Sequence, residues 1–320
     1  MRERLDQHGR VPYREGVKIL VTGSTGLVGK ALVSALAKEG HSVCRLVRPV
    51  TNANDDAGGF NVPWNPKTGE LGGAAVGADA VVNLSGASIG DGRWTEKRKE
   101  ELRASRVDAT RALIAAIGRM TVKPAVFVSA SAIGYYGNRG DEILSEESAA
   151  GEGFLAEIVK AWEAEALKAE AWRTRVVLAR FGIILAKQGG ALAKMLTPFR
   201  MGLGGRLGSG KQWMSWISLE DVFGILKRAI SDAAMFGAVN VVAPEPVTNA
   251  EFTKELARAL RRPAIFPVPP FALRVALGQE MADALLTGSQ RVVPKKLQQI
   301  GHGFRYSSLN SALSAILTEK

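Results

Sequence analysis

A short apolar run that breaks into a glycine-spaced loop constrains the fold of this chain more than any other feature. Residues 17–21 read Val-Lys-Ile-Leu-Val, and the loop that follows contains Gly23, Ser24, Thr25, Gly26, Leu27, Val28 and Gly29. The run predicts a buried parallel strand, because β-branched residues dominate it and polar residues do not alternate along it. Apolar residues at helical spacing over 30–38 predict a helix directly after the loop.

The three glycines have different roles in such a loop. Gly23 permits a tight turn, Gly26 lets backbone N–H groups approach a pyrophosphate, and Gly29 lets the helix pack closely on the strand. The helix N-terminus adds unpaired donors and a positive dipole end. An ordinary turn is the alternative, but the strand before the loop and the helix after it favour a dinucleotide site.

Composition and charge limit the other classes of protein. With 46% hydrophobic and 23% charged residues among 320, the chain reads as an ordinary globular protein. No apolar run approaches the roughly 20 residues of a membrane span. The formal charge of +11 is dispersed and interrupted by acids, as in residues 96–100, which indicates solvated helix faces. We therefore expect neither a nucleic-acid partner nor a membrane partner.

The number of cysteines and the N-terminal residues indicate the cellular compartment. Cys44 is the only cysteine, so no intramolecular disulfide can form, and its place in an expected strand indicates a buried thiol. Residues 1–16 are polar and basic without a signal-like apolar stretch, and they predict a flexible arm, with an overlong start as the alternative. We expect a cytoplasmic protein.

Alternating strands and helices predict the fold class. Strands are expected at 17–21, 41–47, 60–64, 80–84, 125–128 and 175–179, and helices at 30–38, 94–118 and 154–171. This order predicts an α/β, doubly wound parallel sheet, a Rossmann domain over 17–181. Residues 182–320 predict a smaller, mostly helical substrate-side domain that encloses a cleft with the first, and whether the chain crosses between the two is left open. Its expected elements are helices at 219–231, 249–260, 271–286 and 309–317 and a strand at 238–242.

Residues that follow the expected strands indicate the cofactor. Arg48 comes directly after the second strand, where an acidic residue would bind a ribose hydroxyl and an arginine suits the 2′-phosphate of NADP. The cofactor prediction is therefore NADP(H), with a plain surface arginine as the alternative and Arg45 as a weaker candidate. Small residues after the strand at 80–84 predict close backbone approach to the cofactor or a tight turn, and they are Asn83, Leu84, Ser85 and Gly86.

Hydroxyl groups gather after the strand at 125–128. Ser129 and Ser131 end that strand at the carboxyl edge of the sheet, where a serine can donate a hydrogen bond to a substrate carbonyl. Tyr135 and Tyr136 follow, and either could donate a proton. Aromatic packing is the alternative for one of the pair.

Several motifs together resemble the extended short-chain dehydrogenase/reductase superfamily, in its atypical nucleotide-sugar-epimerase-like branch. They are the loop at 21–29, Asn83–Gly86, Gly92–Trp94, Ser105-Arg106, Ser131–Gly137, Trp162-Glu163, the run 195–210 and the tail from Pro267 through 288–297. The resemblance implies an NADP(H)-binding Rossmann domain with a small C-terminal domain. It also implies that Arg180 and Gly182 border the nicotinamide and that Gly210, Lys211, Gln212 and Trp213 contact the substrate, with packing in the wall of the site as the alternative for Trp213.

One departure from the family concerns catalysis. Typical relatives carry Tyr-x-x-x-Lys on the helix that contains Trp162 and Glu163, but Leu155 and Val159 stand at those positions here. Chemistry would then fall to Ser131 as carbonyl binder, with Tyr135 or Tyr136 as proton donor. Arg106 would supply positive charge near the nicotinamide, or would be a salt-bridged helix residue.

Two functions remain open on this sequence. The first is an NADP(H)-dependent oxidoreductase or epimerase acting on an unknown small molecule, such as a nucleotide sugar. The second is a non-catalytic NADP(H)-binding sensor or regulator, linked to cell division through the labels of some relatives. Sugar epimerases of this fold dimerise through two long helices, but Glu157, Glu163 and Glu165 are expected on the outer faces here, which predicts a monomer or a weak homodimer.

Overall fold

The computed structural model describes residues 16–49 and 58–318. The arm predicted over 1–16 lies outside them apart from Gly16. Within the described ranges, no helix is long and apolar enough to cross a membrane.

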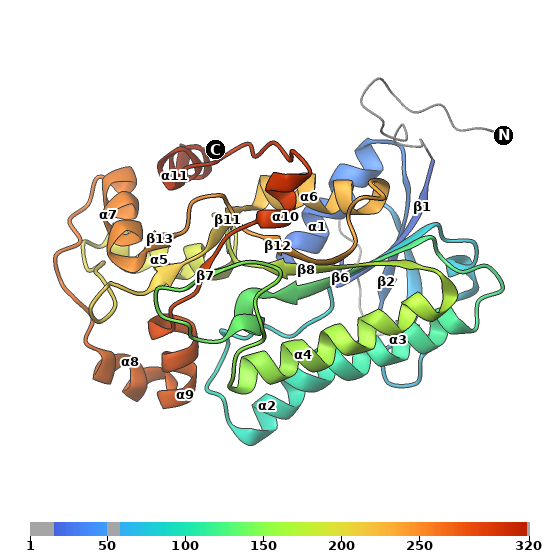
Figure 1. Ribbon diagram of the computed structural model, residues 1–320, viewed down its shortest axis with the longest axis horizontal. Coiled ribbons are helices and arrows are strands. Elements are labelled where there is room, and N and C mark those ends of the chain that lie inside the picture. Colours follow the sequence, from blue (N-terminus) through green and yellow to red (C-terminus); the bar gives the residue numbers. More distant parts are fainter. Residues whose placement is uncertain (1–15, 50–57, 319–320) are drawn as a thin grey trace.

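An eight-stranded sheet forms the centre of the molecule (Figure 1). Its strand order is β12-β8-β6-β5-β1-β2-β3-β4, and every pairing is parallel except that of β4 with β3. The predicted doubly wound sheet is confirmed. The strands are β1 (Lys18–Thr22), β2 (Ser42–Val47), β3 (Phe60–Asn65), β4 (Glu70–Leu71), β5 (Ala80–Asn83), β6 (Val126–Ala132), β8 (Arg175–Phe181) and β12 (Gly237–Val241).

Helices cover both faces of this sheet, which explains why β1 is apolar throughout. Ile19 and Val21 pack into the core beneath α1 (Leu27–Lys38) and α6 (Leu219–Ser231). Leu20 faces the opposite core, beneath α3 (Ala109–Gly118) and α4 (Phe154–Leu167). Successive strand residues point to opposite faces, so a strand buried on both sides cannot alternate in polarity.

The C-terminal part adds short strands and helices beside the sheet (Figure 1). Its separate apolar core joins Leu192 and Leu196, Trp216, Phe252 and Leu313. The strands are β7 (Ile143–Leu144), β9 (Ile183–Leu185), β10 (Trp213–Met214), β11 (Trp216–Ser218), β13 (Val247–Thr248) and β14 (Arg291–Val292). The helices are α5 (Gly190–Arg200), α7 (Asn249–Leu260), α8 (Pro270–Leu277), α9 (Gln279–Ala282), α10 (Lys295–Gln299) and α11 (Leu309–Thr318).

Some elements differ from the sequence prediction. The helix predicted over 94–118 begins as α2 (Glu96–Arg103), because the Thr95 hydroxyl accepts from the Arg98 N–H, and it contains a π-helical turn at Ala104–Asp108. The α5 helix was not predicted, since Gly189 precedes it, Gly190 is its first residue and Pro198 lies inside it. The β12 strand belongs to the part of the chain after residue 181, but it pairs with β8 in the central sheet. The domain boundary at 181 stays a prediction.

Candidate functional site

The loop between β1 and α1 is built so that only glycine fits at two positions. Gly23 has a φ of +64°, and a Cβ there would lie 2.4 Å from the carbonyl oxygen of Leu84. A Cβ at Gly29 would lie 2.1 Å from the Gly23 carbonyl oxygen. The Gly26 N–H donates to that same oxygen at 3.0 Å, which closes the turn. The backbone therefore forms a tight cradle ahead of the α1 N-terminus.

Ser24 gives an independent sign that this cradle takes a ligand. Its hydroxyl oxygen is buried and has no hydrogen-bond partner in the described part of the chain. A buried hydroxyl without a partner costs free energy, so a polar group in the cradle would satisfy it. Thr25 and Gly26 are exposed at the tip, while Leu27 and Val28 are half-buried. The loop fits the pyrophosphate of a dinucleotide.

The two arginines near the end of β2 are in different environments. Arg45 lies within the strand and is almost fully buried, whereas Arg48 directly follows the strand and is exposed. Only Arg48 is open to a ligand that approaches from solvent.

The side chains of Asn83 and Ser129 are hydrogen-bonded to neighbouring groups of the protein. The Asn83 side chain accepts from the Thr22 hydroxyl at 2.7 Å and donates to the Thr110 hydroxyl at 2.8 Å. The buried Ser129 hydroxyl donates to the carbonyl of Ala130 at 3.1 Å. These hydrogen bonds engage the two side chains, and contact of Asn83 and Ser129 with the cofactor stays a prediction. Leu84, Ser85 and Gly86 stay accessible after β5.

Arg106 lies against this β5 loop. Its guanidinium donates to the carbonyls of Ala87 at 2.9 Å and Leu102 at 3.2 Å, and it lies over the ring of Trp162 at 5.5 Å. Burial lowers the pKa of Arg106 to about 10. The alternative of a salt-bridged arginine is wrong, because its contacts in the described residues are carbonyls, a serine hydroxyl and an aromatic ring.

A buried ion pair occupies the carboxyl edge of β6 and β8. Arg180 binds Glu163 through two hydrogen bonds of 2.8 Å each. The Ser131 hydroxyl donates to the same carboxylate at 2.5 Å. The Tyr136 hydroxyl accepts from Arg180 at 3.0 Å and donates to Asn240 at 2.7 Å. One network thus joins β6, α4, β8 and β12.

This network changes the predicted roles of three residues. A carboxylate only accepts hydrogen bonds, so the Ser131 hydroxyl must donate its hydrogen to Glu163. It therefore has no donor left for the carbonyl of a substrate. Burial raises the pKa of Tyr136 to about 12, and the Tyr136 hydroxyl already donates its hydrogen bond to Asn240. Arg180 is held by Glu163. These contacts argue against Ser131 as a carbonyl binder and against Tyr136 as a proton donor, and the place of Arg180 beside the nicotinamide stays a prediction.

Tyr135 differs from its neighbour. It is half-buried, its ring lies 3.5 Å from the guanidinium carbon of Arg180, and no hydrogen bond engages its hydroxyl within the described residues. The preceding Gly134 packs on Leu155, since a Cβ added at Gly134 would lie 3.4 Å from the Cβ of Leu155. Tyr135 therefore directly follows a residue that packs on Leu155, the position at which the Tyr-x-x-x-Lys tyrosine would stand.

The predicted substrate segment is only partly accessible. The Gln212 amide is buried and donates to the carbonyls of Leu207 and Leu286 at 3.0 and 2.9 Å. Lys211 is exposed. The indole of Trp213 donates to Asp141 at 2.8 Å and lies 4.1 Å from the guanidinium carbon of Arg291. Gln212 is thus a structural clamp, and Arg291 is a neighbour that the sequence did not single out.

Two glycines in this region serve packing and turning. A Cβ at Gly182 would lie 2.5 Å from the carbonyl of Ser215, so Gly182 is packed against the chain that leads into β11. Its predicted place beside the nicotinamide stays a prediction. Gly210 has a φ of +72° and its carbonyl accepts from the Ala250 N–H at 2.9 Å, which joins the loop to α7.

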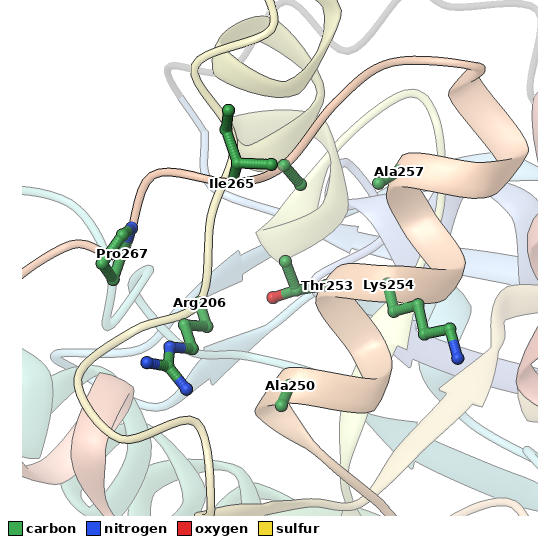
Figure 2. A pocket seen from close by; sticks show the side chains of 8 residues that line it. Arg206, Ala250, Thr253, Lys254, Ala257, Ile265 and Pro267 are labelled. Carbon is green, nitrogen blue, oxygen red and sulfur yellow. The ribbon is translucent and has the colours of Figure 1, made fainter.

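Two cavities of the described residues lie away from this edge of the sheet. One, of about 390 Å³, lies between Arg206, α7 and residues 264–267 (Figure 2). The other, of about 370 Å³, lies beside β4 and is lined by Leu71, Ala116 and Arg119 among others. Neither is lined by the predicted cofactor or catalytic residues.

Comparisons with known proteins agree with this geometry. Residues 19–241 match the model of the NAD dependent epimerase/dehydratase family, and residues 268–316 match a domain of unknown function, DUF1731. The chain is 43% identical over 301 residues to the epimerase family protein ML0860 of Mycobacterium leprae, covering 94% of this chain and 95% of the relative. It is 37% identical over 305 residues to YfhF of Bacillus subtilis, covering 95% and 99%.

A solved structure is similar over the same length. The human epimerase family protein SDR39U1 (isoform 2), crystallised with NADPH, superposes with a TM-score of 0.83 at 32% identity, covering 94% of this chain and 99% of that one.

Proposed function

The chain belongs to the NAD dependent epimerase/dehydratase family, and from that premise we propose that it is an NADP(H)-dependent oxidoreductase or epimerase-like enzyme that acts on a small molecule. The observation that carries the proposal is the cradle at 23–29, in which the buried Ser24 hydroxyl lacks a partner among the described residues. The substrate class that the family resemblance favours is a nucleotide sugar. The setting that we propose is cytoplasmic, without a nucleic-acid partner.

The choice of NADP(H) depends on a second position. Arg48 is exposed directly after β2, where an arginine can pair with a 2′-phosphate. The crystal structure of human SDR39U1 contains NADPH, and that protein is similar over nearly the whole of this chain. We therefore assign the cradle to the pyrophosphate and Arg48 to the 2′-phosphate.

The proposed chemistry uses what the buried network leaves available. The bound cofactor supplies or accepts a hydride. Tyr135 is the hydroxyl group at the β6 edge that no described residue engages, and we assign it the proton transfer to or from the substrate oxygen. Arg106 places positive charge at the loop after β5. Ser131 contributes an acceptor only.

A specific observation favours a second candidate function. Without Tyr-x-x-x-Lys, and with the Ser131 proton committed to Glu163, the site lacks the usual donors to a carbonyl. A protein that binds NADP(H) without turnover, as a sensor or regulator, would need only the cradle and Arg48.

Binding and turnover separate the two candidates. NADPH and NADH are titrated by thermal shift, and carbonyl compounds and nucleotide sugars are screened for NADPH oxidation. We expect NADPH to bind more tightly, Arg48→Ala to abolish that preference, and turnover to fall in Tyr135→Phe but not in the half-buried control Tyr306→Phe. Preferential NADH binding would sink the Arg48 assignment. Tight NADPH binding without any turnover would support the sensor.

A further inference from the structure

Exposed apolar side chains gather in the C-terminal part of the chain. Six large apolar residues of the segments 201–203 and 265–275 are between 57% and 72% exposed, namely Met201, Leu203, Ile265, Phe266, Phe271 and Val275. The α8 helix, with the sequence PFALRVAL, buries none of its residues. Contiguous exposed apolar side chains of this kind mark a surface that something else covers.

These residues belong to two segments that run side by side. The Val268 N–H donates to the Arg206 carbonyl and the Gly208 N–H donates to the Val268 carbonyl, both at 2.9 Å. Gly205 is so close to Phe266 that an added Cβ would lie 1.6 Å from its carbonyl oxygen. In Figure 1 the chain between α7 and α8 runs along one end of the molecule. Residues 200–211 and 258–275 thus form one surface, which we call the basic apolar face.

The charge of this face is of one sign. Residues 188–219 and 256–279 contain no aspartate or glutamate. In the described residues, no carboxylate pairs with Arg200, Arg206, Arg261 or Arg262, and all four are exposed. The cations of the two segments are Arg200, Arg206, Lys211, Arg258, Arg261, Arg262 and Arg274, of which Arg258 pairs with Glu255 and Arg274 with Asp283.

A cavity opens on the same face. The cavity of about 390 Å³ is lined by Arg206, Ile265 and Pro267 together with α7. Figure 2 shows small apolar side chains on its walls and the Thr253 hydroxyl turned toward Arg206. Room for an apolar group therefore lies next to an unpaired cation.

We propose that the basic apolar face docks on an anionic lipid bilayer. A bilayer surface offers phosphate charge and hydrocarbon together, which matches arginines interleaved with Phe, Ile, Leu and Met. A second copy of the chain fits less well, because a two-fold interface would place this cationic face against itself. The sequence alone predicted no membrane partner, because it contains no apolar run long enough to span a bilayer. A surface built from residues 200–211 and 258–275 becomes apparent only in the folded chain.

Vesicle flotation of the full chain tests the proposal. The vesicles contain either phosphatidylglycerol mixed with phosphatidylcholine or phosphatidylcholine alone. We expect binding to the anionic vesicles only, and loss of binding at about 1 M salt, where screening is nearly complete. Ile265→Ser with Phe271→Ser, and separately Arg261→Glu with Arg262→Glu, should each weaken binding about tenfold or more. Phe236→Ser is the matched control, because Phe236 is exposed elsewhere on the molecule.

The NADPH-induced thermal shift confirms that each variant is folded. No binding to anionic vesicles at low salt would overturn the proposal, as would equal weakening by Phe236→Ser. A dimer in sedimentation velocity that Phe271→Ser dissociates would instead assign the face to a second copy. Binding of an acidic protein without vesicle binding would likewise overturn the lipid assignment.

Discussion

At the scale of single residues, Glu163 has the largest influence on which side chains of the site can donate hydrogen bonds, although it was not predicted to act there. Its carboxylate accepts two hydrogen bonds from Arg180 and one from Ser131. The sequence placed Glu163 on an outer helix face, but it is buried, because a cation on the neighbouring strand compensates its charge. A predicted catalytic serine thereby becomes part of a structural network.

We expect Glu163→Gln to destabilise the fold strongly. A neutral amide would leave the buried Arg180 cation without its counter-ion, and breaking a buried pair costs about 3–5 kcal/mol. Urea denaturation followed by circular dichroism measures the loss. Glu157→Gln is the control, since Glu157 is exposed on the same helix, and it should change stability by less than about 0.5 kcal/mol. Similar losses in both variants would contradict the network.

Tyr136 predicts an alkaline stability limit. Its folded-state pKa of about 12 lies above the ordinary value of 10.0, because the phenol is buried. The stability it contributes is complete below pH 10 and is lost as the pH rises through 12, by about 3 kcal/mol in total. Thermal unfolding of the wild type and of Tyr136→Phe across this range measures the effect. An equal decline of Tm in both proteins would refute the assignment.

Gly29 gives a residue-scale test of the cradle. Gly29→Ala would place a Cβ 2.1 Å from the Gly23 carbonyl oxygen, so the loop must open. We expect NADPH binding, measured by isothermal titration, to weaken about tenfold or more. Gly73→Ala, where an added Cβ meets nothing within 4 Å, should bind as the wild type does. Unchanged affinity in Gly29→Ala would remove the cradle from the site.

At the scale of elements, local signals set the ends of helices accurately where a cap is present. The α7 helix begins with a complete capping box, in which Thr248 and Glu251 satisfy each other's backbone N–H groups. Thr248→Ala should cost about 1 kcal/mol in the free energy of unfolding. Thr121→Ala, at an exposed threonine outside any helix, serves as the control. A loss below about 0.3 kcal/mol would show that the cap adds little.

At the scale of the whole molecule, ion pairs occupy the outer side of the α3–α4 pair. Glu165 pairs with Arg111 at 2.9 Å and with Lys168 at 2.6 Å. An interface there would have to desolvate these charges, so we predict that the chain sediments as a monomer at micromolar concentration. A stable dimer that dissociates on Arg111→Ala would contradict this prediction.

The sequence by itself determined the sheet, the alternating order of strands and helices along the chain, and the glycine cradle. Local signals suffice for these features, because a strand buried on both faces must be continuously apolar and Gly23 and Gly29 stand where a side chain cannot fit. The tertiary structure alone decided which polar groups remain free. Ser131, Tyr136 and Arg180 read as site residues along the chain, yet Glu163 and Asn240 engage them from other elements. The availability of a hydrogen-bond donor depends on partners that are distant in sequence, and only folding brings those partners within reach.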